Sequence, residues 1–231
     1  MEERKTIYLC LAHMSETGEE QKYVKEAFDT NWVVPLGPNV NGFEDDLKAF
    51  VSKNSDGSEL SREVVALSAG TAAVHLGLLA SGVGPGDEVC VQSFTFCASS
   101  HPITYLGATP VFIDSEPDSW NMDPELLEKA IIDRKEKTGK YPKAIVPVAL
   151  YGMPYDCDKI MAISKKYGIP VVEDAAEGCG SRWKGQVLGT FGKFGVLSFN
   201  GNKMITTSGG GALICQDAES KNNVMWYATQ A

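Results

Sequence analysis

The chain has 231 residues, of which 43% are hydrophobic and 22% charged, a balance typical of a folded globular protein. Asp and Glu (30) outnumber Lys and Arg (21), and the formal net charge is −9. A duplex-binding surface needs clustered positive charge, so nucleic acid is not an expected partner. There is no long uncharged apolar run, and residues 1–6 lack the regions of a signal peptide. We therefore expect a cytoplasmic protein without a membrane partner.

The cysteines and histidines indicate neither disulfides nor a metal site. None of the six cysteines forms a CxxC pair, and most stand in apolar runs such as residues 87–91. This setting favours buried, reduced thiols. The three histidines are scattered, and His75 lies in an apolar helical stretch where a structural role is expected.

The first part of the chain combines short elements with an irregular loop. An apolar run predicts a strand at residues 7–11. Thr17 followed by Glu20 fits a capping box, so a helix is expected to begin there. Proline and glycine interrupt residues 32–38, which predicts a loop, and a helix is expected over residues 42–52.

Short apolar runs then alternate with helical stretches. The runs are residues 64–67, 88–91, 110–113, 144–148 and 170–172. The helical stretches between them are residues 71–81, 98–106, 124–137 and 156–167. Such alternation predicts an α/β fold with a mostly parallel sheet and helices on both faces. Further strands are expected at residues 185–188, 195–199 and 211–214, some of them antiparallel because the glycine-rich connections between them are short.

Ligands of open α/β sheets bind beyond the carboxyl ends of the strands, so the residues that follow each run are the site candidates. After the first run, small residues lead to Thr71 at a helix start, which is either a phosphate cradle or a plain helix cap. After the second run come Phe94 and Phe96, which either belong to the core or stack on a planar cofactor.

Two further strand ends carry ionisable side chains. Glu173 and Asp174 follow the run at residues 170–172, and strand alternation points one toward the cleft and the other away from it. An acid there binds a ribose, a metal or a protonated ring nitrogen, or is simply solvated. Lys203 follows the strand expected at residues 195–199 and precedes three glycines. Most lysines are surface charges, but this setting favours a chemical role.

Two glycine-rich segments are not nucleotide motifs. Residues 82–86 follow a helix and precede a strand, the reverse of the order in a dinucleotide fingerprint. Gly192 and Lys193 are followed by Phe194, and Val187 stands where a Walker A loop has glycine. We expect both segments to be structural.

A phosphate cradle, an aromatic ring, an acid and a lysine at the strand ends of one sheet match the requirements of pyridoxal phosphate (PLP). The lysine forms a Schiff base, the acid keeps the pyridine nitrogen protonated, and the aromatic ring stacks on the cofactor. The combination is far more specific than any one of these residues.

Four segments resemble the DegT-type sugar aminotransferases, fold-type-I PLP enzymes that aminate nucleotide-linked keto sugars. They are residues 68–72, 93–96, 173–177 and 198–203. Within this family, four stretches are most similar to the 4-aminotransferases of the UDP-N-acetylbacillosamine pathway: residues 12–14, 34–37, 188–192 and 200–211. The resemblance extends over almost the whole chain and implies the large domain of the fold-type-I aminotransferases.

The resemblance implies a role for each matched position. Lys203 corresponds to the Schiff-base lysine and proton shuttle, and Asp174 to the partner of the pyridinium nitrogen. The other implied cofactor contacts are Phe96 for stacking, Glu177 near the ring hydroxyl, and Gly70, Thr71, Ala72 and Ser198 at the phosphate. Some relatives carry histidine at the lysine position and catalyse dehydration, so Lys203 implies transamination.

The implied reaction transfers an amino group from glutamate to a nucleotide-linked 4-keto-6-deoxy sugar, with a UDP-linked N-acetyl sugar as the expected acceptor. Family members form homodimers and continue into a smaller C-terminal domain that is absent from this chain. Residues 1–231 are therefore expected to fold as the PLP-binding large domain with an N-terminal segment, and to have weak or no turnover alone. The alternatives are a catalytically silent cofactor- or sugar-binding domain and a PLP-dependent sugar dehydratase.

Overall fold

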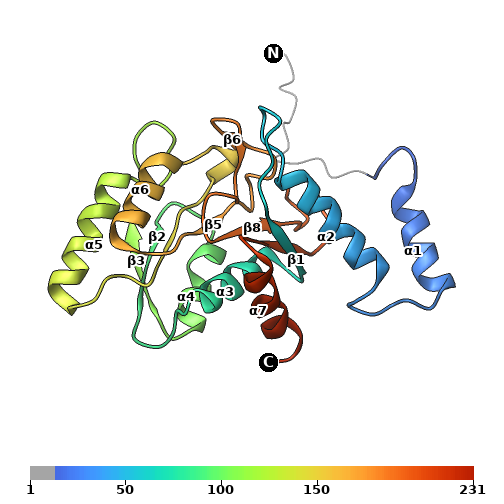
Figure 1. The fold of residues 1–231 in the computed structure, drawn as a ribbon, viewed down its shortest axis with the longest axis horizontal. Helices are drawn as coiled ribbons and strands as arrows, with labels where there is room; N and C mark the ends of the chain where they lie inside the picture. The colour runs from blue at the N-terminus through green and yellow to red at the C-terminus, as the bar shows by residue number, and fades with distance from the viewer. Residues whose placement is uncertain (1–13) are drawn as a thin grey trace, which may run out of the picture.

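The computed structural model describes residues 14–231, and its central feature is a mixed β-sheet flanked by helices (Figure 1). In spatial order the strands are β1 (Glu63–Leu67), β9 (Gly211–Cys215), β8 (Phe194–Ser198), β5 (Val172–Asp174), β4 (Ala144–Val146), β2 (Glu88–Gln92) and β3 (Thr109–Ile113). Parallel bridges from Ile145 to Val171 and from Val148 to Asp174 join β4 to β5. Within this sheet β9 alone is antiparallel to its neighbours, which confirms the mostly parallel α/β fold.

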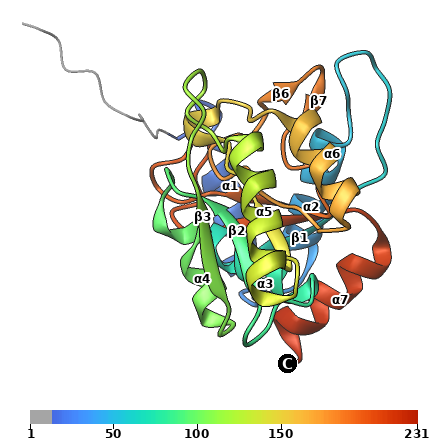
Figure 2. The same cartoon turned by 90° about the vertical axis from the view of Figure 1, so that its left-hand side faces the viewer.

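Successive strand residues face opposite layers of the molecule. Val64 and Ile145 belong to an apolar cluster that includes side chains of α5 (Pro124–Thr138) and α6 (Cys157–Tyr167). Val65 belongs to a second cluster, formed with α3 (Gly70–Ala80), α4 (His101–Tyr105) and α7 (Ala218–Thr229). In Figures 1 and 2, α3, α4 and α7 lie below the sheet and α6 lies above it. Burial on both faces explains why the central strands are nearly continuous apolar runs.

The remaining elements are two helices, two short turns and a hairpin. They are α1 (Glu19–Asp29), α2 (Pro38–Val51), the 3₁₀ turns η1 (Cys97–Ser99) and η2 (Leu150–Gly152), and the hairpin β6 (Arg182–Trp183) and β7 (Gln186–Val187). Figure 1 shows α1 away from the sheet, and none of its residues is buried. None of the helices in residues 14–231 is both long and apolar enough to cross a membrane.

Two predicted helix starts are wrong. Gly18 takes the N-cap position of α1 without a side-chain cap. Glu20 instead accepts hydrogen bonds from the Ser15 N–H (2.8 Å) and hydroxyl (2.5 Å), so there is no capping box. Helix α2 begins at Pro38, before the predicted residue 42, because proline is well suited to the first helical position, where its missing N–H costs nothing.

Other predicted elements are shorter than expected. The helix expected over residues 98–106 is divided into η1 and α4, and Pro102 near the start of α4 cannot donate to a preceding turn. The strand expected at residues 185–188 is reduced to β7. The strand expected at residues 7–11 lies outside the described residues. Among the described cysteines, all free, Cys97 is exposed, contrary to the expectation of buried thiols.

Candidate active site

A cavity of about 590 Å³ lies at the carboxyl ends of β1, β5 and β8. Seven of the predicted site residues line it: Gly70, Thr71, Phe96, Asp174, Glu177, Ser198 and Lys203. Ala72 is one residue further along α3 and is not part of the wall. The residues predicted from strand ends therefore lie in one cavity, although Gly70 and Lys203 are 133 positions apart in the sequence (203 − 70).

The N-terminus of α3 forms one end of the cavity. Ala69, the N-cap residue, makes no side-chain cap, so the first backbone N–H groups of the helix have no partner of that kind. A Cβ atom on Gly70 would lie 2.8 Å from the Cβ of Ser198, so only glycine permits this close approach. The helix dipole, free N–H groups and the hydroxyls of Thr71 and Ser198 together suit an anion such as a phosphate.

Glu173 and Asp174 face opposite sides of β5, as strand alternation predicts, and both are buried. Glu173 points away from the cavity and accepts N–H groups from Gly189 (2.9 Å), Phe191 (2.6 Å) and Gly192 (2.5 Å). Burial raises the pKa of this carboxyl group, and the three N–H donors oppose the rise. The turn around Gly192 is thus structural, as expected.

Asp174 lines the cavity and is held by two donors. The Ser99 hydroxyl donates to Oδ2 at 2.6 Å and the Ala176 N–H to Oδ1 at 3.1 Å. Burial raises the pKa of Asp174, while these donors and the charge of Lys203 lower it. A buried carboxylate of this kind is a suitable partner for a cationic ring nitrogen, which would compensate its charge.

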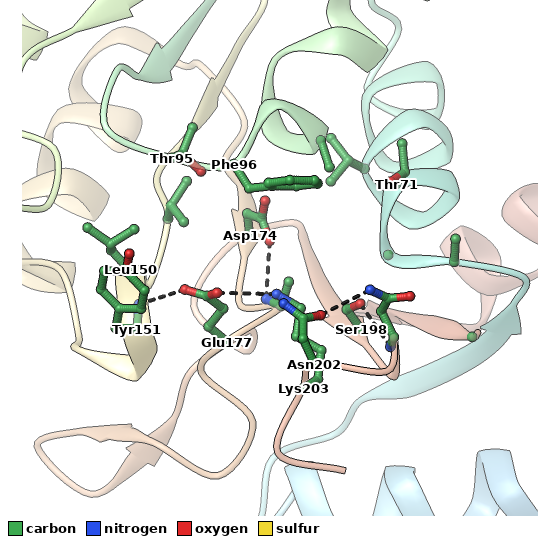
Figure 3. Close-up of a pocket in the computed structure, with 18 of the residues that line it drawn as sticks. Thr71, Thr95, Phe96, Leu150, Tyr151, Asp174, Glu177, Ser198, Asn202 and Lys203 are labelled. Atoms are coloured by element: carbon green, nitrogen blue, oxygen red, sulfur yellow. Dashed lines mark hydrogen bonds and ion pairs between the residues drawn. The ribbon is translucent and has the colours of Figure 1, made fainter. Parts of the chain in front are cut away.

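The aromatic residues after β2 are not core residues. Phe96 is 73% exposed although it is a large apolar side chain. Figure 3 shows its ring above Asp174, with Glu177 and Lys203 on the lower side of the cavity. Phe94 also lines the cavity and contacts Trp120, with ring centroids 5.8 Å apart. The Phe96 ring is therefore available for stacking on a planar ligand.

Lys203 lies on the loop between β8 and β9, and its amine points into the cavity (Figure 3). Its Nζ atom is 3.3 Å from Glu177 Oε1, and Glu177 Oε2 accepts the Tyr151 N–H at 2.7 Å. Only 14% of the Lys203 side chain is exposed, so this is not the usual solvated surface lysine.

Sequence reasoning missed the residues that support this arrangement. Ser99 holds Asp174, and Tyr151, which has a left-handed backbone (φ 51°), presents its N–H to Glu177. The buried Asn121 side chain accepts the Leu150 N–H (3.1 Å) and donates to the Met153 carbonyl (2.9 Å), which fixes the turn around Tyr151. No motif in the sequence indicated these contacts, because each of them joins segments that are 26 or more positions apart.

These residues fit PLP at its phosphate, ring nitrogen, ring face and aldehyde. The α3 N-terminus with Thr71 and Ser198 suits the phosphate, and Asp174 suits a protonated ring nitrogen. Phe96 offers a ring face, and Lys203 an amine for the aldehyde. Residues 14–231 contain no cluster of three or more His, Cys, Asp or Glu side chains able to hold a metal ion.

Comparison with known proteins agrees with this geometry. The model of the DegT/DnrJ/EryC1/StrS aminotransferase family matches residues 14–230. The chain is 49% identical over 227 residues to EpsN of Bacillus subtilis, a protein assigned as a PLP-dependent aminotransferase, covering 98% of this chain and 56% of that protein. It is 40% identical to the GDP-perosamine synthase of Caulobacter vibrioides (87% and 50% covered). It is also 40% identical to the UDP-2-acetamido-2-deoxy-3-oxo-D-glucuronate aminotransferase of Pseudomonas aeruginosa (80% and 47% covered).

Solved structures show the same fold. NtdA from Bacillus subtilis, with the bound cofactor PMP, matches with a TM-score of 0.78 and 29% identity, covering 93% of this chain and 45% of that one. DesI, determined in the presence of its TDP-sugar product, matches with a TM-score of 0.79 and 28% identity (91% and 50% covered). The chain spans about half the length of the curated relatives it matches.

Proposed function

The chain belongs to the DegT/DnrJ/EryC1/StrS aminotransferase family, and we propose that it is the cofactor-binding part of an enzyme that aminates a nucleotide-linked keto sugar. PLP is the cofactor of this family. The observation that carries the proposal is the convergence of Lys203, Asp174 and Phe96 with the start of α3 on one cavity. No single member of this set is specific, but the four together are what a PLP site needs.

Each residue has a distinct task in the proposed reaction. When bound, PLP supplies an electron sink for the carbon that loses its proton. The Asp174 carboxylate accepts a hydrogen bond from the ring nitrogen and so keeps that nitrogen protonated. Phe96 keeps the ring plane fixed by stacking. The α3 N-terminus, Thr71 and Ser198 hold the phosphate. The place of Ala72 in this set rests on the family resemblance, because its side chain is not in the cavity wall.

Lys203 has two tasks in the proposal: it binds the cofactor covalently and, once displaced by an amino substrate, moves the proton at the substrate carbon. Glu177 supports both, because its carboxylate lies 3.3 Å from Lys203 Nζ and fixes the direction of the amine. The Tyr151 N–H holds the other oxygen of Glu177, so the pair has a defined geometry before substrate arrives.

For the substrates, we propose glutamate as amino donor and a UDP-linked N-acetyl-4-keto-6-deoxy sugar as acceptor. The relative from Pseudomonas aeruginosa is named for a UDP-linked acetamido sugar, which supports UDP. The relative from Caulobacter vibrioides is named for a GDP-linked sugar, so the nucleotide is the part of the proposal that most needs a test.

We also propose that residues 1–231 correspond to the large domain and that the complete enzyme is a homodimer with a further, smaller C-terminal domain. The support is that the matched relatives are about twice as long as the aligned segment. The exposed Phe96 and Tyr151 at the cavity are consistent with a wall completed by other parts of such an assembly.

Two measurements on the full-length protein test these proposals. Borohydride reduction of the PLP-loaded protein should fix the cofactor on Lys203, identified by peptide mass spectrometry, whereas Lys203→Ala should abolish fixation. Lys129→Ala, at an exposed position on α5, is the matched control. Absence of fixation on Lys203 would refute the cofactor assignment.

The second measurement incubates the same protein with glutamate and UDP-, dTDP- or GDP-linked 4-keto sugars. We expect 2-oxoglutarate and an amino sugar, with the highest kcat/KM for a UDP-linked N-acetyl sugar. A preference for another nucleotide would overturn the substrate proposal alone. Loss of water from the sugar without amine formation would show that the enzyme is a dehydratase.

A further inference from the structure

Two hydroxyl groups support Asp174: that of Ser99, which is buried outside the cavity wall, and that of Thr95, which lines the cavity. Ser99, in η1, is fully buried, and its Oγ atom donates to Asp174 Oδ2 at 2.6 Å. The hydroxyl of Thr95 is 2.8 Å from the same Oγ atom. An ionised carboxylate only accepts hydrogen bonds, so the Ser99 proton points to Asp174 and the Thr95 hydroxyl donates to Ser99.

The second carboxylate oxygen is also fixed, because Oδ1 accepts the Ala176 N–H at 3.1 Å. With one donor on each oxygen, the plane of the Asp174 carboxylate has a single orientation. Each oxygen keeps a free lone pair for a ligand in the cavity. Thr95 lies beside Phe96 in the sequence, so the stacking residue and the donor to Ser99 belong to the same short loop.

The electrostatic effect of Ser99 opposes that of burial. Burial raises the pKa of Asp174, and the hydrogen bond from Ser99 is the largest influence that lowers it again. Lys203 lowers this pKa further and Glu177 raises it, and these are the charged side chains that act on Asp174. Without the hydroxyl, a buried acid competes more strongly for the proton of any ring nitrogen bound against it.

We propose that Ser99, oriented by Thr95, is a positioning residue that keeps Asp174 ionised and aligned, so that the ring nitrogen of the cofactor retains its proton. This inference rests on the proposed function, because it requires a PLP ring nitrogen at Asp174. Ser99 does not line the cavity and therefore acts only through Asp174.

The test uses the full-length protein loaded with PLP that carries ¹⁵N in the ring, whose NMR shift reports directly whether that nitrogen is protonated. In the wild type we expect the shift of a protonated ring. In Ser99→Ala it should move toward that of the neutral ring, and kcat for the half-reaction with glutamate should fall about tenfold, the loss expected for one hydrogen bond to a charged group. The KM for glutamate should change less than about threefold, because Ser99 does not contact the substrate.

Ser100→Ala is the matched control, because the neighbouring hydroxyl donates to the Cys97 carbonyl and not to Asp174. Thr95→Val, which removes the first hydroxyl of the pair, should shift the resonance in the same direction by a smaller amount. It also carries the test if Ser99→Ala does not fold. A Ser99→Ala protein with the wild-type shift and kcat would overturn the inference. A wild-type protein that binds no PLP would instead refute the proposed function.

Discussion

Replacing Glu173 by glutamine should destabilise the protein strongly, although the two side chains have the same shape. The carboxylate accepts the N–H groups of Phe191 and Gly192 on one oxygen and that of Gly189 on the other. Glutamine has one oxygen, and its NH₂ group would face at least one of these donors. The displaced backbone N–H would be buried without an acceptor, at about 1–3 kcal/mol, and the new amide would have only the Tyr155 hydroxyl near it. We expect a loss of about 1–6 kcal/mol, the upper end applying if the amide also stays unpaired, against the about 5–15 kcal/mol typical of a domain.

The assay is urea unfolding followed by circular dichroism, with the free energy obtained by linear extrapolation. The control is Glu136→Gln, which removes the same charge from an exposed position on α5 and should change stability by less than about 0.5 kcal/mol. If Glu173→Gln were no less stable than Glu136→Gln, the three N–H groups would not depend on the carboxylate, and the structural role of Glu173 would be refuted.

Three further predictions concern the cavity, the sheet and the thiols. Burial raises the pKa of Asp174 above its ordinary 3.8, so some of the folded protein keeps this proton at a pH where a free acid has lost it. Protonation thus stabilises the ligand-free fold at low pH, and this contribution is lost as pH rises. Only the ionised acid pairs with a cationic ring nitrogen, so the affinity for deoxypyridoxine phosphate, measured by calorimetry, should rise more steeply with pH above the ordinary Asp pKa in the wild type than in Asp174→Asn, which shares the titration of the ligand's phosphate; equal slopes would contradict this pairing. Gly195→Ala should lose more than about 2 kcal/mol in urea unfolding, because its Cβ would collide with the Gly189 carbonyl oxygen; a loss below 0.5 kcal/mol, on the scale of a surface change, would contradict this contact. In a Cys10→Ser background, a thiol reagent should label the exposed Cys97 first and leave Cys90 unreacted, since Cys90 is buried and its pKa is raised to about 12; equal labelling rates would contradict the burial.

The sequence alone predicted the residues whose role depends on position along a strand. Asp174 and Lys203 were identified because they follow apolar runs, and strand ends converge on one edge of a sheet. Strand alternation also predicted that the side chains of Glu173 and Asp174 point to opposite sides of the sheet. These inferences succeed because they need only the periodicity of a strand, which is a local property.

Contacts between distant segments were not predictable in the same way. Ser99 and Asp174 are 75 positions apart, and nothing in either segment encodes their 2.6 Å contact. The start of α1 was predicted wrongly for a different reason: Thr17 and Glu20 have the spacing of a capping box, but Glu20 binds the nearby Ser15 instead. Where several local hydrogen-bond partners compete, the one that forms depends on the path of the whole chain.

The opposite orientations of Glu173 and Asp174 make β5 intolerant of any slip along its axis. Moving the strand by one residue in one direction would place Asp174 against the turn of glycines and Ala175 at the cavity. Moving it in the other direction would place Glu173 at the cavity and Val172 against the turn. The register of this three-residue strand is thus constrained twice, once by the contacts of Glu173 and once by the proposed role of Asp174. A single-residue insertion or deletion just before Glu173 would be expected to remove both together, whereas point substitutions can separate them.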